Sequence, residues 1–510
     1  MQVGVDGKIE QGKQLDPSAA PAAALKAGFA ERVKTAIIWR SGSQIVAQLI
    51  TWSATFLVVR LLQPEDYGLF AMTQVMLVFL TLMNGYGFAN ALVQNESIDR
   101  KKIAQVFGML ILLNGFLAAA QLALAPIAAA YFRQPVVADL LRVQALIFLT
   151  TPFIALPNAL LSRELDFKNQ AKVNLVAAVL GAGTTLTLAS QGYGVWTLVW
   201  GGLVLFWTRA IGLTLVTRWI VWPSFRFKGA GQMFRYGGAM VVVQFFWFLQ
   251  SQSDIFIAGR LLDPHMLGLY TTALLLTQLL ADRFVPPLNE VAFAAYARMQ
   301  GQGDAFGQAF LKAVRLVMLI VLPFYLGLAA TAEPLVLTVL GDKWADTIPL
   351  VRILALAMPF LTLQLLFGPA NNGAGRAGIS LRIAIAGSII MPSCFFVGIQ
   401  YGIYGLALGC LAGFPILAAA TAILSLRGIG VSGSALGRAL VPGLLASGMM
   451  MLAVLGLDQL LPPMGPQARL SVLVASGMGT YACLLFLLAR PLLDEALALL
   501  GRSKPAPQPA

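Results

Sequence analysis

Long apolar runs alternate with short polar segments along most of this chain. A helix needs about 20 predominantly apolar residues to cross the hydrocarbon core of a bilayer, and fourteen runs are long enough to do so. The pattern therefore predicts an all-α, polytopic membrane protein with about 14 transmembrane helices. The expected helix cores are residues 38–60, 67–93, 103–130, 137–161, 172–190, 194–217, 237–258, 267–285, 311–332, 350–367, 380–399, 403–426, 438–457 and 470–490.

The eighth run is the least regular of these segments. Pro286 and Pro287 follow it directly. Proline lacks a backbone donor and clashes with the preceding turn. We therefore expect the helix to stop or kink at this pair.

The basic residues indicate how the helices are oriented. With the N-terminus inside, 28 of the 35 Lys and Arg residues fall in the inner segments, as expected because basic loops resist translocation. Both termini are therefore predicted to be cytoplasmic, in a bacterial inner membrane. The outer segments keep Arg60, Arg133, Arg142, Arg260, Lys343, Arg352 and Arg469.

Two halves of the chain resemble each other. Residues 60–70 read RLLQPEDYGLF and residues 260–270 read RLLDPHMLGLY, at an offset of 200. A second pair, YGVWTL at 193–198 and YGIYGL at 401–406, has an offset of 208. Each unit would hold six helices, so the units insert in the same orientation and are related by an axis along the membrane normal. In the shared turn, the simplest interpretation is structural: proline ends one helix and glycine opens the next.

The repeat predicts the domain organisation. Two six-helix bundles, an N-lobe and a C-lobe, are followed by two further helices outside the repeat. The expected segments are a cytoplasmic tail at 1–35, the N-terminal bundle at 36–218, a cytoplasmic linker at 219–236, the C-terminal bundle at 237–427, the final helix pair at 437–490 and a cytoplasmic tail at 491–510.

The composition agrees with a membrane-embedded chain. Of 510 residues, 58% are hydrophobic and 11% are charged, with a mean hydropathy of +0.78, whereas soluble domains are about 25% charged. The net charge of +13 does not indicate nucleic-acid binding, because the basic residues are scattered between apolar runs and form no stripe. The first 35 residues lack the apolar core of a signal peptide.

Three cysteines, Cys394, Cys410 and Cys483, fall inside apolar runs without metal-ligand spacing. We expect small, buried packing residues and neither a metal site nor a cofactor.

Several motifs carry a family resemblance. They are the segment from Trp39 to Gln94 that contains RLLQPEDYGLF and ends in GFANALVQ, SDIFIAGR at 253–260, GDKW at 341–344 and NNGAGR at 371–376. In order and spacing, over roughly residues 36–430, they resemble the Wzx-like polysaccharide flippases of the multidrug/oligosaccharidyl-lipid/polysaccharide exporter superfamily. The matched positions are largely turn residues, so they support the fold and family better than the substrate.

The resemblance implies a MATE-like fold and a transport activity. The cargo would be an undecaprenyl-diphosphate-linked oligosaccharide repeat unit, moved to the periplasmic leaflet for exopolysaccharide, capsule or O-antigen assembly. It also implies alternating access coupled to ion antiport, a cationic central cavity, and contact with membrane lipid and the polysaccharide polymerase or export machinery. No enzymatic activity is implied.

Ionisable residues within the apolar runs are candidates for this transport. Asp254 lies in a polar stretch of the seventh run, and Gln250 shares its helical face at i, i+4. Their functional interpretation is binding of the coupling ion or, for Asp254, balancing the charge of the cavity. The alternative is pairing with a neighbouring helix for packing.

Four arginines are candidates for the diphosphate headgroup, because guanidinium groups match phosphate oxygens. They are Arg40, Arg142, Arg209 and Arg352. The alternative is that these long side chains extend to the membrane interface. His265, the only histidine, is expected in a solvated outer turn, with Glu65 at the equivalent repeat position.

Two competing functions stay open. The same architecture could export a drug or a peptidoglycan lipid precursor, because fold does not determine function. A membrane-embedded polysaccharide polymerase or ligase needs a large outer loop, and the longest one expected here is about 333–349, without histidine or a catalytic motif.

Overall fold

The computed structural model describes residues 42–85, 99–164, 166–217, 221–225 and 231–488, and these residues form helices and connecting turns without a β-strand. The first helix spans Gly42–Leu61. It is followed by α2 (Pro64–Thr81), α4 (Arg100–Phe132), α5 (Val136–Gln144), α6 (Leu146–Arg163), α7 (Phe167–Ser190), α8 (Trp196–Thr217), α9 (Gly231–Leu261), α10 (Pro264–Arg298), α11 (Asp304–Ala330), α12 (Ala332–Val339), the 3-10 helix η1 (Asp342–Thr347), α13 (Ile348–Gly373), α14 (Ala377–Gly398), the 3-10 helix η2 (Ile399–Tyr401), α15 (Gly402–Ile429), α16 (Gly433–Leu460) and α17 (Pro466–Leu488).

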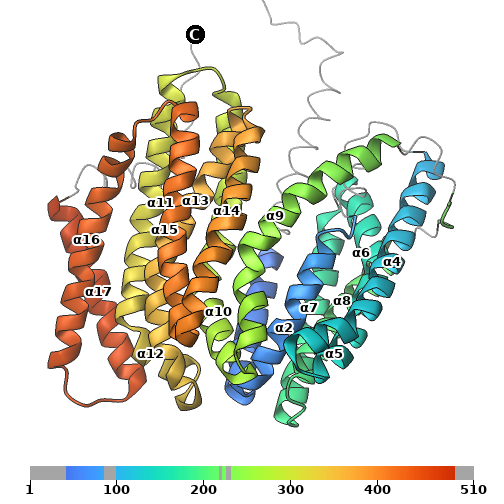
Figure 1. Ribbon diagram of the computed structural model, residues 1–510, viewed down its shortest axis with the longest axis horizontal. Coiled ribbons are helices and arrows are strands. Elements are labelled where there is room, and N and C mark those ends of the chain that lie inside the picture. Colours follow the sequence, from blue (N-terminus) through green and yellow to red (C-terminus); the bar gives the residue numbers. More distant parts are fainter. Residues whose placement is uncertain (1–41, 86–98, 165, 218–220, 226–230, 489–510) are drawn as a thin grey trace, which may run out of the picture.

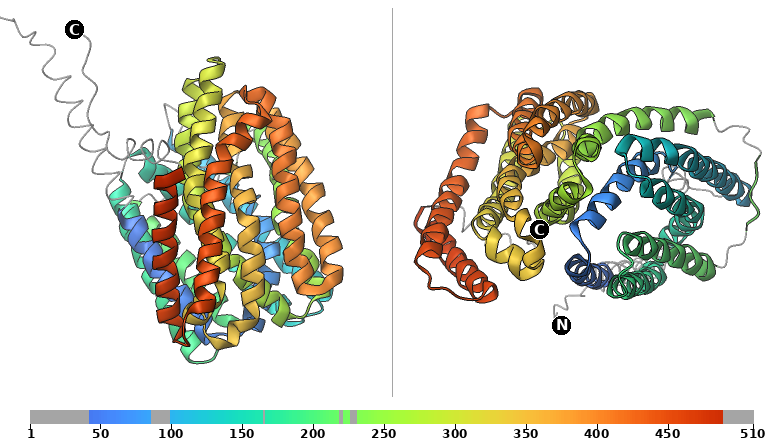
Figure 2. Two further views of the ribbon diagram at one scale, coloured as in Figure 1. Left: turned by 90° about the vertical axis from the view of Figure 1, so that its left-hand side faces the viewer. Right: turned by 60° about the horizontal axis from the view of Figure 1, so that its bottom comes forward.

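The helices form two groups that lie side by side (Figure 1). The helices before α9 form one group, and α9 to α15 form the other, in which α9 packs mainly against α14. Helices α16 and α17 pack against α11 and α12 at the far edge of the second group (Figure 2). The packing between the groups runs through α2, which contacts both α9 and α10.

Ten helical stretches of the described residues are long and apolar enough to cross a membrane. The chain is therefore a multi-pass, all-α membrane protein. Helices α2, α9 and α10 are not among the ten, and these three pack against one another at the centre of the molecule. The count of fourteen crossings stays a prediction.

The repeated turns position α2 and α10. Gln63 caps α2, where its backbone N–H donates to the Asp66 carboxylate (3.0 Å), and Asp263 caps α10 by accepting the Met266 N–H (2.8 Å). Each helix then begins at a proline, which suits the first helical position because the missing N–H has no partner there. The expectation that Gly68 and Gly268 open these helices is wrong: both glycines lie one turn inside.

Three local predictions also differ from the structure. Helix α10 does not stop at Pro286 and Pro287 but continues to Arg298. The carbonyls that these prolines leave without an intrahelical donor belong to Asp282 and Arg283, which are exposed and can take other hydrogen-bond partners. The alternative expectation, a kink at this pair, stays a prediction. The expected outer loop at 333–349 is largely helical, in α12 and η1. Cys410 is buried as expected, but Cys483 is exposed, so the packing interpretation is wrong for that cysteine.

Candidate functional site

A polar stripe follows one face of the first helix. Gln44, Gln48 and Thr51 are spaced by four and three residues, so their side chains lie above one another on one face of the helix. Polar side chains on a membrane helix usually face protein or a water-filled cavity. The stripe therefore marks the side of this helix that turns away from lipid.

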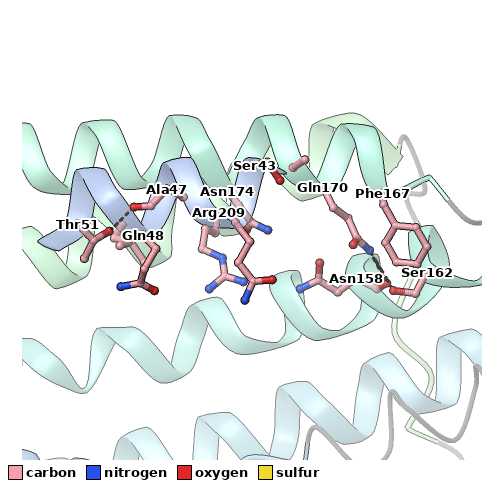
Figure 3. Close-up of a pocket in the computed structure, with 13 residues that line it drawn as sticks. Ser43, Ala47, Gln48, Thr51, Asn158, Ser162, Phe167, Gln170, Asn174 and Arg209 are labelled. Atoms are coloured by element: carbon pink, nitrogen blue, oxygen red, sulfur yellow. Dashed lines mark hydrogen bonds between the residues drawn. The ribbon is translucent and has the colours of Figure 1, made fainter. Parts of the chain in front are cut away.

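This stripe forms one wall of a cavity of about 500 Å³ in the first group of helices (Figure 3). Helices α6, α7 and α8 form the other walls, and the volume lies within the roughly 300–1,000 Å³ of small-molecule sites. The lining residues are Ser43, Gln44, Ala47, Gln48, Thr51, Asn158, Ser162, Phe167, Gln170, Ala171, Asn174, Leu205 and Arg209.

Amide and hydroxyl groups dominate the cavity, and Arg209 is the one charged side chain among the thirteen described residues that line it. The Gln170 amide donates to the Asn158 carbonyl (3.0 Å) and to the Ser162 hydroxyl (3.1 Å), which joins α7 to α6. The buried Asn174 Oδ1 accepts no hydrogen bond from the described residues. A buried acceptor of this kind calls for a partner, so the cavity can take a ligand that donates hydrogen bonds.

The chemistry of this cavity suits a sugar attached to an acidic group. Amide and hydroxyl side chains both donate and accept, as sugar hydroxyls do. A guanidinium group offers a planar set of donors to phosphate or carboxylate oxygens. None of the described residues that line the cavity is acidic, so none of them opposes an anion.

Asp254 occupies a second buried position, between α9 and α10. Its carboxylate accepts the Tyr270 hydroxyl (2.9 Å) and the Ile255 N–H (2.8 Å), and the Tyr270 hydroxyl lies 3.3 Å from the Cys410 sulfur on α15. The side chain is 6% exposed, so Asp254 faces protein rather than lipid. This small cluster joins three helices of the second group.

Gln250, one turn before Asp254, packs in a different direction. Its side-chain oxygen lies against Gly387 of α14, where a Cβ on the glycine would come within 2.1 Å. Gln250 and Asp254 thus share a helix but contact different neighbours.

The two charged interior residues are not duplicated in the repeat. At the offset of 200 the counterpart of Asp254 is Ala54, and at the offset of 208 the counterpart of Arg209 is Leu417. A charge within the membrane costs about 2.5–3.5 kcal/mol on insertion scales. Each charge is present in only one half, so the repeated architecture does not require either of them.

The three candidate arginines that the structure describes do not converge. Arg209 lines the cavity, and Arg40 lies outside the described residues. Arg142 pairs with Asp139 on its own helix (2.7 Å), where both side chains are more than half exposed. Arg352 lies 3.4 Å from Glu333, which also contacts Arg469 (3.3 Å).

The sequence interpretation missed the amide residues of the cavity. Apart from Gln250, the candidates predicted from the sequence are charged residues, whereas Gln48, Asn158 and Asn174 are neutral. The helical spacing of Gln44, Gln48 and Thr51 was the available signal.

Comparison with known proteins places this geometry in context. The polysaccharide biosynthesis protein family matches residues 57–349. The succinoglycan biosynthesis transport protein ExoT of Rhizobium meliloti (strain 1021) is 25% identical over 342 residues, 66% of this chain and 69% of that protein. The lipopolysaccharide biosynthesis protein WzxC of Escherichia coli (strain K12) is 22% identical over 355 residues, 69% of this chain and 72% of that protein.

Two solved structures show the same fold. The lipid II flippase MurJ, in an inward closed conformation, has a TM-score of 0.74 at 13% identity and covers 89% of this chain and 100% of its own. An inward-facing multidrug resistance MATE family transporter has a TM-score of 0.61 at 19% identity and covers 79% of this chain and 99% of its own. At these identities the likeness concerns the fold alone.

Proposed function

The chain belongs to the polysaccharide biosynthesis protein family, and from this premise we propose that it is a flippase for lipid-linked oligosaccharides. Its cargo is an undecaprenyl-diphosphate-linked repeat unit, moved from the cytoplasmic to the periplasmic leaflet of the inner membrane. The unit then enters exopolysaccharide, capsule or O-antigen assembly, where the polymerase or export machinery takes it over. Both termini are cytoplasmic in this proposal.

The observation that carries the proposal is a cavity whose described lining is made of amide, hydroxyl and apolar side chains and one cation, Arg209. A lipid-linked oligosaccharide presents sugar hydroxyls next to a diphosphate. In the proposed complex the amide and hydroxyl groups bind the sugars, and the Arg209 guanidinium binds the diphosphate or an acidic substituent of the sugar. A purely apolar drug would leave these polar groups desolvated without partners.

The ion-coupling role is assigned to the second group of helices. Asp254 is the proposed carboxylate that binds the coupling ion, and Gln250 lies one turn away on the same helix. Loading and unloading of a buried carboxylate changes the charge inside the bundle. An ion that binds one conformation better than the other shifts the equilibrium between the inward and outward states.

The remaining arginines are assigned to the ends of the transport path. Arg142 lies in the last turn of α5 and Arg352 near the start of α13, and both are exposed. They are proposed to contact the cargo headgroup on the outer side. Arg40 is proposed to contact it on the inner side.

Reconstitution tests the proposal. Purified protein in liposomes, with a fluorescent polyprenyl-diphosphate oligosaccharide in both leaflets, should move the lipid so that an added impermeant reagent reaches the inner-leaflet pool. An Arg209→Gln protein should move it at least tenfold more slowly. Equal rates for the two proteins would remove Arg209 from the site, and no movement by either protein would contradict the flippase assignment.

A further inference from the structure

The two repeated segments meet where the two groups of helices converge. Gly68 of α2 packs against the backbone of Pro264, and Gly268 of α10 packs against the backbone of Pro64. A Cβ on Gly68 would lie 1.9 Å from the Pro264 carbonyl oxygen, and a Cβ on Gly268 would lie 1.7 Å from the Pro64 carbonyl oxygen. The contact is therefore reciprocal, and small residues at both positions allow the backbones to approach closely.

The arginines that begin the repeated segments form a second reciprocal contact. Arg60 donates to the carbonyls of Thr338 and Val339 (Nε to the Val339 oxygen, 2.8 Å), in the last turn of α12. Arg60 precedes α2, whereas α12 belongs to the opposite group of helices.

Arg260 makes the corresponding contact in the other direction. Its guanidinium donates to the carbonyls of Ala130 (3.2 Å) and Tyr131, in the last turn of α4. Ala130 and Thr338 are 208 residues apart, as are Tyr131 and Val339, which is the offset of the second sequence repeat.

Each contact has a clear physical basis. The last four carbonyls of a helix have no partner within that helix and carry partial negative charge. A guanidinium group satisfies two of them at once with charge-assisted hydrogen bonds. His265 Nδ1 and Glu65 Oε1, at equivalent repeat positions, add a cross-group contact of 2.7 Å.

We propose that these contacts form the outer gate of the transport path, and that the gate opens as one unit by releasing Arg60 and Arg260 together. The term outer gate refers here to Arg60, Gly68, Arg260 and Gly268 with their backbone partners. Its assignment to the outer side rests on the proposed function and orientation. Because both arginines bridge the same two groups of helices, the groups separate at this end only when both sets of hydrogen bonds break.

Hydrogen–deuterium exchange on the full chain in lipid nanodiscs, without cargo, tests the gate. The readout is exchange in two segments, residues 128–140 and residues 334–346, which contain the carbonyls that accept from Arg260 and Arg60. An Arg60→Gln change should accelerate exchange about tenfold in both segments, since a lost charge-assisted hydrogen bond destabilises the closed state by about that factor. Arg260→Gln should do the same, and the double variant should show roughly the product of the two factors.

Arg438→Gln is the matched control, because it removes an exposed guanidinium whose hydrogen bond, to the Ser434 carbonyl, stays within one helix. It should leave exchange in both segments unchanged. If each gate variant affects only the segment it contacts, or if Arg438→Gln has the same effect as the gate variants, the single-unit gate is wrong.

Lysine variants test whether the effects of the glutamine variants come from misfolding. Arg60→Lys and Arg260→Lys keep the charge but not the planar set of donors, so their effects should be smaller and still shared by both segments. The exchange experiment requires no cargo, so it can contradict the gate while liposome transport stands. Conversely, if the protein does not transport the lipid but each gate variant still accelerates exchange in both segments, the proposed function alone is contradicted.

Discussion

Arg209 and Asp254 are the two residues whose surroundings most directly suggest transport. Arg209 lies among neutral amide and hydroxyl side chains, and Asp254 is held by the Tyr270 hydroxyl in a buried cluster. Their repeat counterparts, Leu417 and Ala54, are apolar. The two halves therefore share a backbone design but differ in their interior chemistry, which is consistent with cargo binding in one half and ion coupling in the other.

Replacing Arg209 tests the cargo side of this division. We expect Arg209→Gln to reduce polymer export by tenfold or more at equal protein level, because a hydrogen bond to a charged group contributes about 1.5–3 kcal/mol. Arg438→Gln is the control, since Arg438 is exposed and its hydrogen bond to the Ser434 carbonyl (3.4 Å) stays within its own helix. Export that is equally reduced in both variants would point to a general loss of positive charge.

Replacing Asp254 tests the coupling side. Asp254→Asn keeps the shape and can still accept from Tyr270, so the protein should insert and fold but lose transport. Tyr270→Phe should weaken transport less, because it removes one hydrogen bond and leaves the carboxylate in place. Asp304→Asn, at an exposed helix start, is the control. Normal export by the Asp254→Asn protein would show that the carboxylate is structural.

At the scale of elements, the repeated turn determines where α2 and α10 begin and where they touch each other. Gln63 and Asp263 cap their helices, and Pro64 and Pro264 occupy the first helical positions. The glycines one turn later carry no turn conformation of their own. They are small because α2 and α10 touch backbone to backbone at that height.

A methyl group at this contact should disturb it. Gly68→Ala should lower the free energy of unfolding of the purified protein by about 1–3 kcal/mol, the usual cost of overpacking. The Pro264 backbone carbonyl occupies the space that the added methyl group would need. Gly115→Ala in α4 is the matched control, since a Cβ there meets no atom within 4 Å. If the two variants have equal free energies of unfolding, the close contact between α2 and α10 does not contribute to stability and the prediction is wrong.

At the scale of the whole molecule, the family resemblance noted in the sequence is confirmed. The family match spans residues 57–349, and the relatives ExoT and WzxC align over about two thirds of the chain. The fold agrees with solved flippase and MATE structures. The comparisons do not give the orientation of the chain in the membrane, which is predicted from the distribution of Lys and Arg.

Cysteine labelling in intact cells checks the orientation. A Gln191→Cys protein, substituted in the turn after α7, should react with an impermeant thiol reagent from the periplasm. A Ser432→Cys protein, substituted before α16, should react only after the inner membrane is opened. The unsubstituted chain provides the background from its own cysteines. The reverse pattern would invert the predicted topology and place the proposed gate on the inner side.

The sequence alone determined that the protein is helical, membrane-embedded and related to polysaccharide transport proteins. A lipid environment requires long apolar runs. A residue such as Pro64 favours a helix start through its own backbone, whatever the helix packs against. The tertiary structure decided which residues meet. It joined Gln48, Asn158 and Arg209 in one cavity and separated Arg142 from it.

The glycine contact illustrates the physical reason for this difference. Helix formation depends on neighbours within a few residues, so it can be inferred from local sequence. The meeting of Gly68 with Pro264, nearly 200 residues away, depends on how the helices pack in three dimensions. Local hydrophobicity predicts where each helix lies along the chain, but only packing determines which faces of two helices touch.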